Sequence, residues 1–301
     1  LVDAPDIVLP SRTDPQPGIP QMKKGSQPTD GGFLILTEDE KHDLLKKEPD
    51  AEKWLRVYMG GDELIYGTSR WCLWLKGISP MELKTLPKVL DRISHVRTAR
   101  LKSPTKSVRE YAAFPSLFTQ DRQPTIDYLA LPEVSSENRL FIPMTFLQHA
   151  VIASNKLQIV VGATLYHLGI LSSTMHMAWV RSVAGRLESR YSYAPAVYNN
   201  FPWPDHPTEK QTTAIKEAAQ QVLDTRAAHP ESSLADLYDP VAMPPDLRKA
   251  HQTLDRAVDA AYGKKVFTSD AERVAFLFDL YQKYTSLLPA VEKKKKRTKK
   301  S

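Results

Sequence analysis

A short stretch in the second half of the chain concentrates side chains that can hydrogen bond to DNA bases. It holds Arg186, Glu188, Arg190 and Ser192, with Tyr191 and Tyr193 between them. If the stretch is extended, alternate residues share a face, so Glu188, Arg190 and Ser192 project together and the tyrosines project the other way. Arginine pairs bidentately with guanine, and a carboxylate accepts a hydrogen bond from cytosine N4. The pattern therefore fits a probe that enters a DNA groove, and it also fits an ordinary polar surface hairpin.

The residues before this stretch predict the elements that hold it. An apolar run over residues 157–171 is interrupted by two glycines, Gly162 and Gly169. Apolar residues then recur at i, i+4, i+5 and i+8, which is one face of a helix; they are Met175, Trp179, Val180 and Val183. We expect Gly185 to end this helix as a C′ glycine. The polar stretch would then follow the helix directly.

Basic residues are concentrated in the middle of the chain. Residues 92–192 hold twelve Lys and Arg against six Asp and Glu, an excess of six positive charges. The whole chain carries a formal net charge of +6, and the lysine-rich end accounts for another six positive charges, so the remainder is acidic. A basic middle suits a surface that faces DNA, and a chance cluster of solvated charge is the alternative.

Three parts of this basic segment are candidate contacts to the DNA backbone. A helix predicted over residues 79–101 has a basic side, which fits phosphate contacts or an ordinary solvated face. A polar loop over residues 134–139 lies between two predicted strands, 128–131 and 141–144, and its residues suit either phosphate or any turn. The third part is the arginine that opens the polar stretch. The candidate backbone contacts are Arg97, Arg100, Ser135, Ser136, Arg139 and Arg186.

The composition is that of a globular protein. The length of 301 residues suggests two domains, and 42% hydrophobic residues are enough for a core. The single cysteine, Cys72, excludes a disulfide framework and a four-cysteine zinc site, and it favours a reducing compartment such as the cytoplasm. The sequence shows no bilayer-spanning apolar run and no signal-peptide pattern. Because the first residue is Leu rather than Met, we expect a fragment or an unusual start codon.

Composition and periodicity divide the chain into four parts. Residues 1–30 are rich in Pro, Gly, Ser and Asp and are predicted to be an extended linker. Residues 31–206 are predicted to form an α+β domain. Residues 207–290 are predicted to form a small all-α domain, with helices at 210–228, 245–262 and 269–288. Residues 291–301 form a lysine-rich tail of low complexity, which is predicted to be disordered.

Several short elements can be placed at the start of the α+β domain. A buried strand at 33–36 precedes a capping box, Thr37 with Glu40, that opens a helix to about Lys47. A second helix is predicted at 49–58, because Pro49 suits a first helical position. Strands are predicted at 64–66 and 71–75.

The motifs of DNA-modifying catalysis are missing from this sequence. A methyltransferase needs a glycine-rich loop for S-adenosylmethionine, and an adenine-N6 enzyme needs an Asn/Asp/Ser-Pro-Pro-aromatic motif to hold the flipped base. Residues 200–203 read Asn-Phe-Pro-Trp, with Phe where the first Pro is required. No nuclease pattern and no metal-ligand spacing is present, and His167 and His176 lie in apolar surroundings that favour core positions. Any catalysis is therefore expected from other domains.

Several long segments resemble the target recognition domain of the type IIL, MmeI-like, restriction–modification enzymes. They occur in the order of that family and cover roughly residues 20 to 290 of the chain. The segments are DGGFLILTEDE (30–40), RWCLWL (70–75), LPEVSSENRLFIPMTFL (131–147), HMAWVRSVAGRLESRYSY (176–193), YNNFPWP (198–204) and DRAVDAAYG (255–263). The family joins a nuclease, an adenine-specific DNA methyltransferase and a recognition domain that both activities share.

The resemblance implies roles for particular residues. Recognition residues in the family act in pairs, which implies that Glu188 pairs with Arg190 and that Lys156 pairs with Ser192. The first pair would read a C·G base pair and the second a guanine. The resemblance also implies that residues 1–30 lead out of a methyltransferase domain. S-adenosylmethionine and Mg²⁺ would then belong to the domains that are missing from this sequence.

These observations favour a DNA recognition module. The expected partners are double-stranded DNA and a methyltransferase domain, either on the same polypeptide or on a separate chain. One alternative is an interaction module that docks on a separate methyltransferase subunit and contacts DNA little. Another alternative is an enzyme with an unrecognised site.

Overall fold

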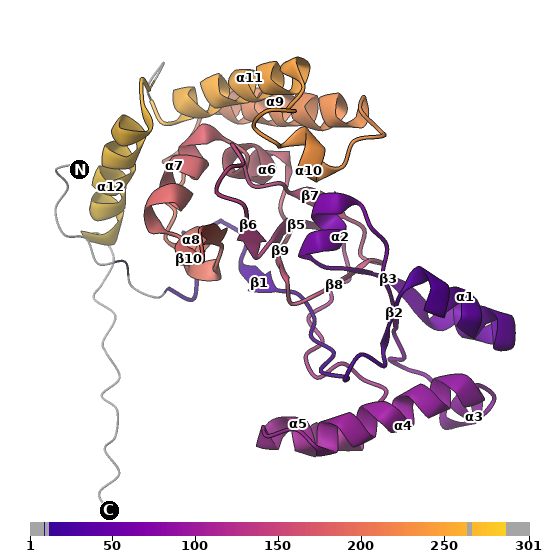
Figure 1. Ribbon diagram of the computed structural model, residues 1–301. Helices are drawn as coiled ribbons and strands as arrows, with labels where there is room; N and C mark the ends of the chain where they lie inside the picture. The colour runs from indigo at the N-terminus through magenta and orange to yellow at the C-terminus, as the bar shows by residue number, and fades with distance from the viewer. Residues whose placement is uncertain (1–8, 10–11, 264–266, 287–301) are drawn as a thin grey trace, which may run out of the picture.

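The computed structural model describes residues 9, 12–263 and 267–286 of the chain. Over these residues the chain forms small sheets with flanking helices, followed by a helical C-terminal region, which confirms the predicted fold class (Figure 1). The predicted basic tail, residues 291–301, lies outside the described residues. None of the helices in the described part is long and apolar enough to cross a membrane.

The central sheet has the strand order β1-β9-β5-β7, with every neighbouring pair antiparallel. Its strands are β1 (Met22–Lys24), β9 (Leu157–Val161), β5 (Tyr128–Pro132) and β7 (Thr145–Leu147). Both faces of β5 are covered, because Leu129 and Leu131 pack into one apolar cluster while Tyr128 and Ala130 pack into another. Strand β5 is therefore buried along its whole length, and it forms the rigid base for the loop that follows it.

Strand β1 lies within the segment that composition predicted to be an extended linker. Met22 is buried and pairs with Val160 of β9. Directly after the strand, a Cβ on Gly25 would lie 2.3 Å from the carbonyl oxygen of Ser154, so only glycine allows this approach. The linker prediction is wrong for these residues because Pro and Gly content does not reveal a three-residue edge strand.

The second strand of the predicted hairpin is displaced along the chain. Strand β7 occupies Thr145–Leu147, whereas Phe141, Ile142 and Met144 are buried without belonging to a strand. An apolar run predicts that its side chains are buried, but burial alone does not determine which backbone groups pair in the sheet.

A second sheet has the order β2-β4-β3-β8 and packs beside α1. Its strands are β2 (Ile35–Leu36), β4 (Trp71–Leu73), β3 (Leu55–Met59) and β8 (Ile152–Ala153), and α1 spans Glu38–Lys47. The predicted capping box is confirmed: Thr37 Oγ1 accepts from the Glu40 backbone N–H at 3.2 Å, and Glu40 Oε2 accepts from the Thr37 N–H at 2.9 Å. The buried Cys72 lies in β4.

Two element predictions in this region are wrong. The helix predicted at 49–58 is a 3₁₀ helix, η1 (Pro49–Trp54), followed by strand β3. Residues 64–66 belong to helix α2 (Gly61–Tyr66) and not to a strand. Helix α2 forms because Glu63 accepts a hydrogen bond from the Gly60 N–H at 2.7 Å, which ties the first turn.

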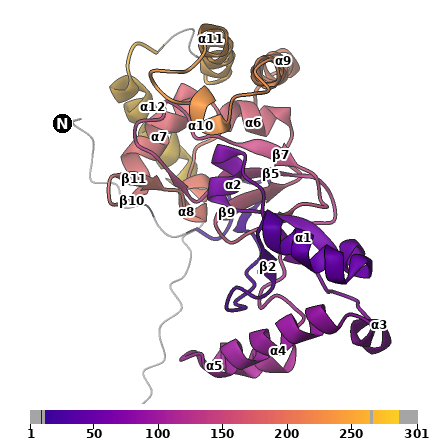
Figure 2. The same cartoon turned by 45° about the vertical axis from the view of Figure 1, so that its right-hand side comes forward.

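The predicted basic helix is divided at Pro87. Its parts are α3 (Pro80–Lys84) and α4 (Pro87–Leu101), followed by α5 (Lys106–Glu110) and η2 (Tyr111–Ala113). Proline has no backbone N–H and cannot continue a helix, so Pro87 takes the first position of a new one. These helices form a layer on the opposite side of the molecule from the C-terminal helices (Figures 1 and 2).

A third sheet, β10-β11-β6, contains the polar stretch. Helix α6 (Leu165–Leu171) and helix α7 (Thr174–Val183) precede it. The strands are β10 (Gly185–Leu187), β11 (Arg190–Ser192) and β6 (Val134–Ser135), and α8 (Pro195–Asn199) follows. Gly185 does not cap α7 as a C′ glycine. The C-cap residue of α7 is Ala184, whose backbone is extended, and Gly185 is already part of β10.

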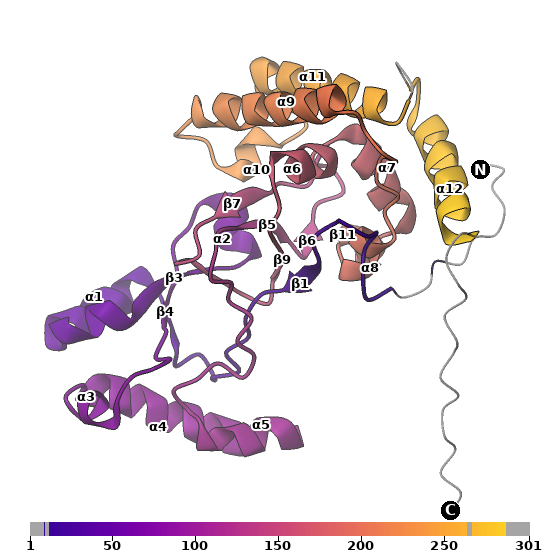
Figure 3. The same cartoon turned by 180° about the vertical axis from the view of Figure 1, so that it is seen from behind.

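The three predicted helices of the C-terminal region are confirmed over the described residues; positions 287–288, the end of the third prediction, lie outside them. The three helices are α9 (Glu209–Ala227), α11 (Pro245–Ala261) and α12 (Asp270–Ser286), with the short α10 (Leu234–Leu237) between the first two. Helices α9 and α11 lie over α6, and α12 lies beside α7 (Figure 3). One apolar cluster includes residues of the mixed region, such as Leu168 and Trp179, and residues of these helices, such as Leu254 and Leu277. The two regions therefore share a core.

Gly169 makes the contact between α6 and the C-terminal helices possible. A Cβ at this position would lie 2.7 Å from Ile215 Cγ2 of α9, and 3.2 Å from both Ala219 Cβ and Leu254 Cδ1. We predict that Gly169→Ala lowers the free energy of unfolding by about 1–3 kcal/mol, because the helices have to separate. Urea denaturation measures this change.

The matched control is Gly185→Ala, whose added Cβ would find its nearest neighbour, Ser192 Cβ, at 4.0 Å. This control should stay within about 0.5 kcal/mol of the unchanged chain. Equal effects of the two substitutions would show that the α6 contact is not tight.

Candidate nucleic-acid interface

The polar stretch forms a two-stranded hairpin. Gly185 pairs with Ser192, Arg186 with Tyr191, and Leu187 with Arg190. Glu188 and Ser189 form the turn, and Glu188 has a φ of +57°, which the tight primed turns of hairpins require. An extended chain would have placed Glu188 and Arg190 on one strand face. This prediction is wrong, because Glu188 lies in the turn. It reaches Arg190 instead through an ion pair, with Glu188 Oε2 2.7 Å from the Arg190 guanidinium.

From Arg190 to Tyr193 the side chains alternate as the sequence predicted. Arg190 is exposed and Ser192 is partly exposed, whereas Tyr191 and Tyr193 are buried. Arg186 lies over the ring of Tyr191, with its guanidinium carbon 3.9 Å from the ring centroid, and donates to the Ser189 carbonyl at 3.0 Å. The exposed polar side chains therefore stand on a hairpin that is fixed from beneath.

The loop after β5 lies against this hairpin. Strand β6 pairs with β11, so that Ser135 is opposite Tyr191 and Val134 is opposite Ser192. The side chain of Ser189 hydrogen bonds to Glu137, and this bond, together with the nearby Arg186 and Arg190, lowers the pKa of the Glu137 carboxyl. Residues about 50 positions apart in the sequence thus form one polar surface.

Tyr193 anchors the hairpin to the core. Its N–H donates to the Glu133 carbonyl at 2.7 Å, and its carbonyl accepts from Gln158 Nε2 at 3.0 Å. Its hydroxyl lies 2.8 Å from His176 Nε2, and His176 Nδ1 lies 2.8 Å from the Leu171 carbonyl. A carbonyl can only accept, so Nδ1 carries the proton and Nε2 accepts from the tyrosine. His176 is therefore a buried neutral core residue, as predicted.

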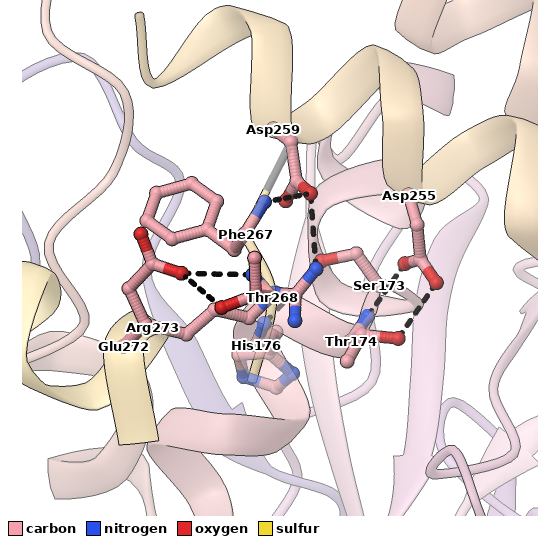
Figure 4. A network of polar contacts seen from close by, with 9 residues as sticks. All are labelled: Ser173, Thr174, His176, Asp255, Asp259, Phe267, Thr268, Glu272 and Arg273. Carbon is pink, nitrogen blue, oxygen red and sulfur yellow. Dashed lines mark hydrogen bonds and ion pairs between the residues drawn. The ribbon is translucent and has the colours of Figure 1, made fainter. Parts of the chain in front are cut away.

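Helix α7, which leads into the hairpin, is fixed at its start by the C-terminal region (Figure 4). The carboxylate of Asp255 in α11 accepts from the Thr174 N–H at 2.7 Å and from its hydroxyl at 2.6 Å. Nearby, Asp259 forms a buried ion pair with Arg273 of α12 at 2.9 Å. Burial raises the pKa of both aspartates. The C-terminal helices thus supply polar groups that orient α7.

Lys156 and Ser192, the second predicted pair, lie on either side of Glu133. The Glu133 N–H donates to the Lys156 carbonyl at 2.9 Å, and the next residue, Val134, is opposite Ser192. The exposed Lys156 ammonium lies 4.0 Å from the Glu133 carboxylate, which also binds Lys24 at 2.5 Å. The structure therefore brings these residues together at one end of strands β1, β5 and β9 of the central sheet.

Glu133 and Lys24 were missed from the sequence. Lys24 lies in the segment that was predicted to be linker, and Glu133 has no pattern around it that distinguishes it from other loop carboxylates.

Beside Lys156 is a hollow of ≈ 520 Å³, whose lining includes Thr29, Tyr58, Arg70 and Asn155.

Arg100 is not available for DNA contacts, contrary to the prediction. It is 1% exposed and donates to five backbone carbonyls at 2.7–3.3 Å. These belong to Pro28, Thr29, Tyr111, Phe114 and Leu117. Its role is to bind loops together, because a buried guanidinium needs acceptors for its donors. A helical charge pattern cannot show which arginine points inwards.

Ser135 is also buried, at 2% exposure, so a phosphate cannot reach it as predicted. It lies in β6 opposite Tyr191 of β11, and its hydroxyl finds no hydrogen-bond partner among the described residues. The remaining predicted backbone contacts are accessible: Arg97 and Arg186 are exposed, and Ser136 and Arg139 are partly exposed.

The structure offers no obvious metal site within the described residues. No group of three or more His, Cys, Asp or Glu side chains there is placed to hold an ion. His167, the other histidine that was predicted to lie in apolar surroundings, accepts a hydrogen bond from the Thr164 N–H at 3.0 Å and so caps helix α6.

Family models match almost the whole chain. Residues 3–205 match the model described as "MmeI, target recognition domain", and residues 207–289 match "MmeI, C-terminal domain". The chain is 39% identical, over 286 residues, to DNA methyltransferase A of Bacillus subtilis (strain 168).

A solved structure is similar over the same range. The Type IIL restriction-modification enzyme MmeI, in complex with DNA, matches 94% of this chain with a TM-score of 0.91 and 49% sequence identity. The chain spans 32% of the length of the Bacillus protein and 38% of the MmeI chain, so it corresponds to about a third of each.

The buried histidines predict how stability changes with pH. Burial lowers the pKa of His176 and of His251 from 6.5 to about 3, so both are neutral in the folded chain. The unfolded chain binds these protons first as the pH falls. The stability present above pH 6.5 is therefore lost towards pH 3, by up to about 1.4 kcal/mol per pH unit for each histidine.

Urea unfolding of the unchanged chain and of His176→Gln across this range measures the effect. Glutamine does not titrate, so the variant should lose stability less steeply with falling pH. The raised pKa values of Asp255 and Asp259 act in the opposite direction but are common to both proteins. Parallel curves for the two proteins would contradict the assignment.

Proposed function

The chain belongs to the MmeI family of restriction–modification enzymes, and from this premise we propose that it is a sequence-specific double-stranded DNA recognition module. The observation that carries the proposal is the hairpin of residues 185–192. It presents paired donor and acceptor side chains to solvent while its other face is anchored in the core. Rigid presentation of this kind is what base-edge recognition requires, because misplaced donors lose hydrogen bonds.

Glu188 and Arg190 are proposed to read one C·G pair. In the unbound chain they bind each other at 2.7 Å, which holds an acceptor and a donor side by side. On DNA, Glu188 would accept from cytosine N4 while Arg190 donates to the guanine of the same pair. Their mutual ion pair is exposed and weak, so exchanging it for base contacts costs little.

Lys156 and Ser192 are proposed to read a guanine. Lysine can donate to guanine O6 and N7, and serine is short enough to leave it room. Lys156 is 69% exposed in its side chain, and Glu133 lies near enough to orient its ammonium group. Arg97, Ser136, Arg139 and Arg186 remain proposed contacts to the DNA backbone.

The parent enzyme is proposed to be a site-specific adenine-N6 DNA methyltransferase. This chain would direct it to its target, and S-adenosylmethionine and Mg²⁺ would bind to other domains. Such an enzyme would act on DNA in the cytoplasm. The premise is the family membership, together with the 39% identity to a DNA methyltransferase.

Substituting two arginines separately tests the division between base and backbone contacts. Arg190→Ala should weaken binding to the specific site by about 1–3 kcal/mol and relax preference at one base pair. Arg97→Ala should weaken specific and random DNA alike and reduce the salt slope by about one unit. Fluorescence anisotropy with both kinds of duplex at several salt concentrations measures these effects. Equal losses on both duplexes for both variants would contradict the assigned roles.

An exchange of charge tests which pair is read. The double variant Glu188→Lys with Arg190→Asp reverses donor and acceptor on the hairpin. It should change the preferred base pair from C·G to G·C at one position and leave the others unchanged. Selection from randomised duplexes by the 301-residue chain shows the preference. An unaltered preference in a folded double variant refutes the assignment, and a chain without any affinity for DNA favours a docking module instead.

A further inference from the structure

A large apolar side chain stands in the middle of the proposed reading surface. Leu187 is 50% exposed, and its two neighbours along the chain, Arg186 and Glu188, are exposed as well. Other exposed apolar side chains of comparable size lie on other elements; they are Tyr66, Met81, Leu90, Leu101, Phe114, Ile126 and Val241. Single exposed leucines are common on protein surfaces, so it is the place of Leu187 opposite Arg190, and not its exposure alone, that matters here.

The register of the hairpin defines where Leu187 points. It is the cross-strand partner of Arg190, and directly opposite residues share one face of a hairpin. Gly185 and Ser192, the next pair but one, lie on that same face. The opposite face carries Tyr191, which is buried, with the Arg186 guanidinium over its ring. Leu187 therefore belongs to the same solvent-facing surface as the proposed base-reading side chains.

The backbone around Leu187 holds it in place. The Glu188 turn, the bond from Arg186 to the Ser189 carbonyl and the hydrogen bond of Ser189 to Glu137 all fix the tip. The strand that follows, β11, pairs with β6, and the buried Tyr193 comes directly after it. The leucine cannot turn inwards to join the core without breaking these contacts.

We propose that Leu187 is a specificity-determining residue that contacts the C5 position of a pyrimidine, where thymine carries its methyl group, beside the base pair read by Arg190. This inference rests on the proposed function. The major groove displays the methyl group of thymine next to the acceptors and donors of the neighbouring pair, and apolar side chains recognise it by contact. Opposite residues in a hairpin have Cβ atoms about 5 Å apart, and bases stack at about 3.4 Å. A side chain next to Arg190 is thus placed for the adjacent base pair.

Removing single methyl groups from the DNA tests the inference. Thymines of the preferred duplex are replaced one at a time by deoxyuridine, which differs only in the C5-methyl. In a second arm, cytosines are replaced one at a time by 5-methylcytosine. Binding of the 301-residue chain should weaken about three- to fivefold at one position when a methyl is lost, or strengthen similarly when one is added. The arm that responds identifies which pyrimidine is read.

Variants connect the methyl effect to the leucine. Leu187→Ala and Leu187→Gln should bind with and without the methyl group equally, whereas Leu187→Met, which keeps an apolar side chain, should retain the difference. Val241→Ala removes another exposed apolar side chain, in the loop between α10 and α11, and should respond like the unchanged chain. Circular dichroism confirms that each variant is folded.

The outcomes separate the two proposals. Sequence-specific binding without any methyl dependence, or a methyl dependence that Leu187→Ala and Leu187→Gln retain, overturns the role of Leu187 and leaves the recognition module intact. Binding without any sequence preference in the unchanged chain overturns both.

Discussion

The structure depends on a buried chain of hydrogen bonds from the Leu171 carbonyl through His176 to the hydroxyl of Tyr193. It joins the end of α6, the first turn of α7 and the residue directly after the hairpin. Because the imidazole is buried and neutral, each of its nitrogens has one possible role, and the tyrosine has to donate to it. Tyr193 also binds the Glu133 carbonyl and Gln158, so the same residue ties the hairpin to the central sheet. The proposed reading surface is therefore rigid because its base is buried.

The C-terminal helices are part of this support. They share an apolar cluster with the mixed region, and Gly169 allows α9 and α11 to approach α6 closely. Asp255 binds Thr174 at the start of α7, eleven residues before the hairpin begins at Gly185. A helix N-terminus leaves backbone N–H groups without partners, and here a carboxylate from a distant helix satisfies one of them. The family model for the C-terminal domain thus corresponds to a region that fixes helix α7, which leads into the hairpin of residues 185–192.

The candidate site combines residues whose exposure could not be deduced from charge alone. Arg97 and Arg100 lie on one helix, yet the first is exposed and the second is enclosed by five carbonyls. Ser135 and Ser136 are neighbours, yet one is in a strand and buried while the other is partly exposed. Leu187 shows the reverse case, an apolar residue that remains at the surface. In each case the partner elements, and not the residue type, determine what solvent or DNA can reach.

The sequence by itself determined the elements with strong local signals. The capping box of Thr37 and Glu40, the apolar face of α7, the long C-terminal helices and the alternation of Arg190, Tyr191 and Ser192 all depend on neighbours within a few residues. Only the tertiary structure decided that residues 22–24 complete the sheet, that 64–66 are helical, that Glu188 lies in a turn, and that Glu133 stands between Lys24 and Lys156. These features arise from pairing between segments far apart in the chain, and such pairing leaves no periodic pattern in the sequence.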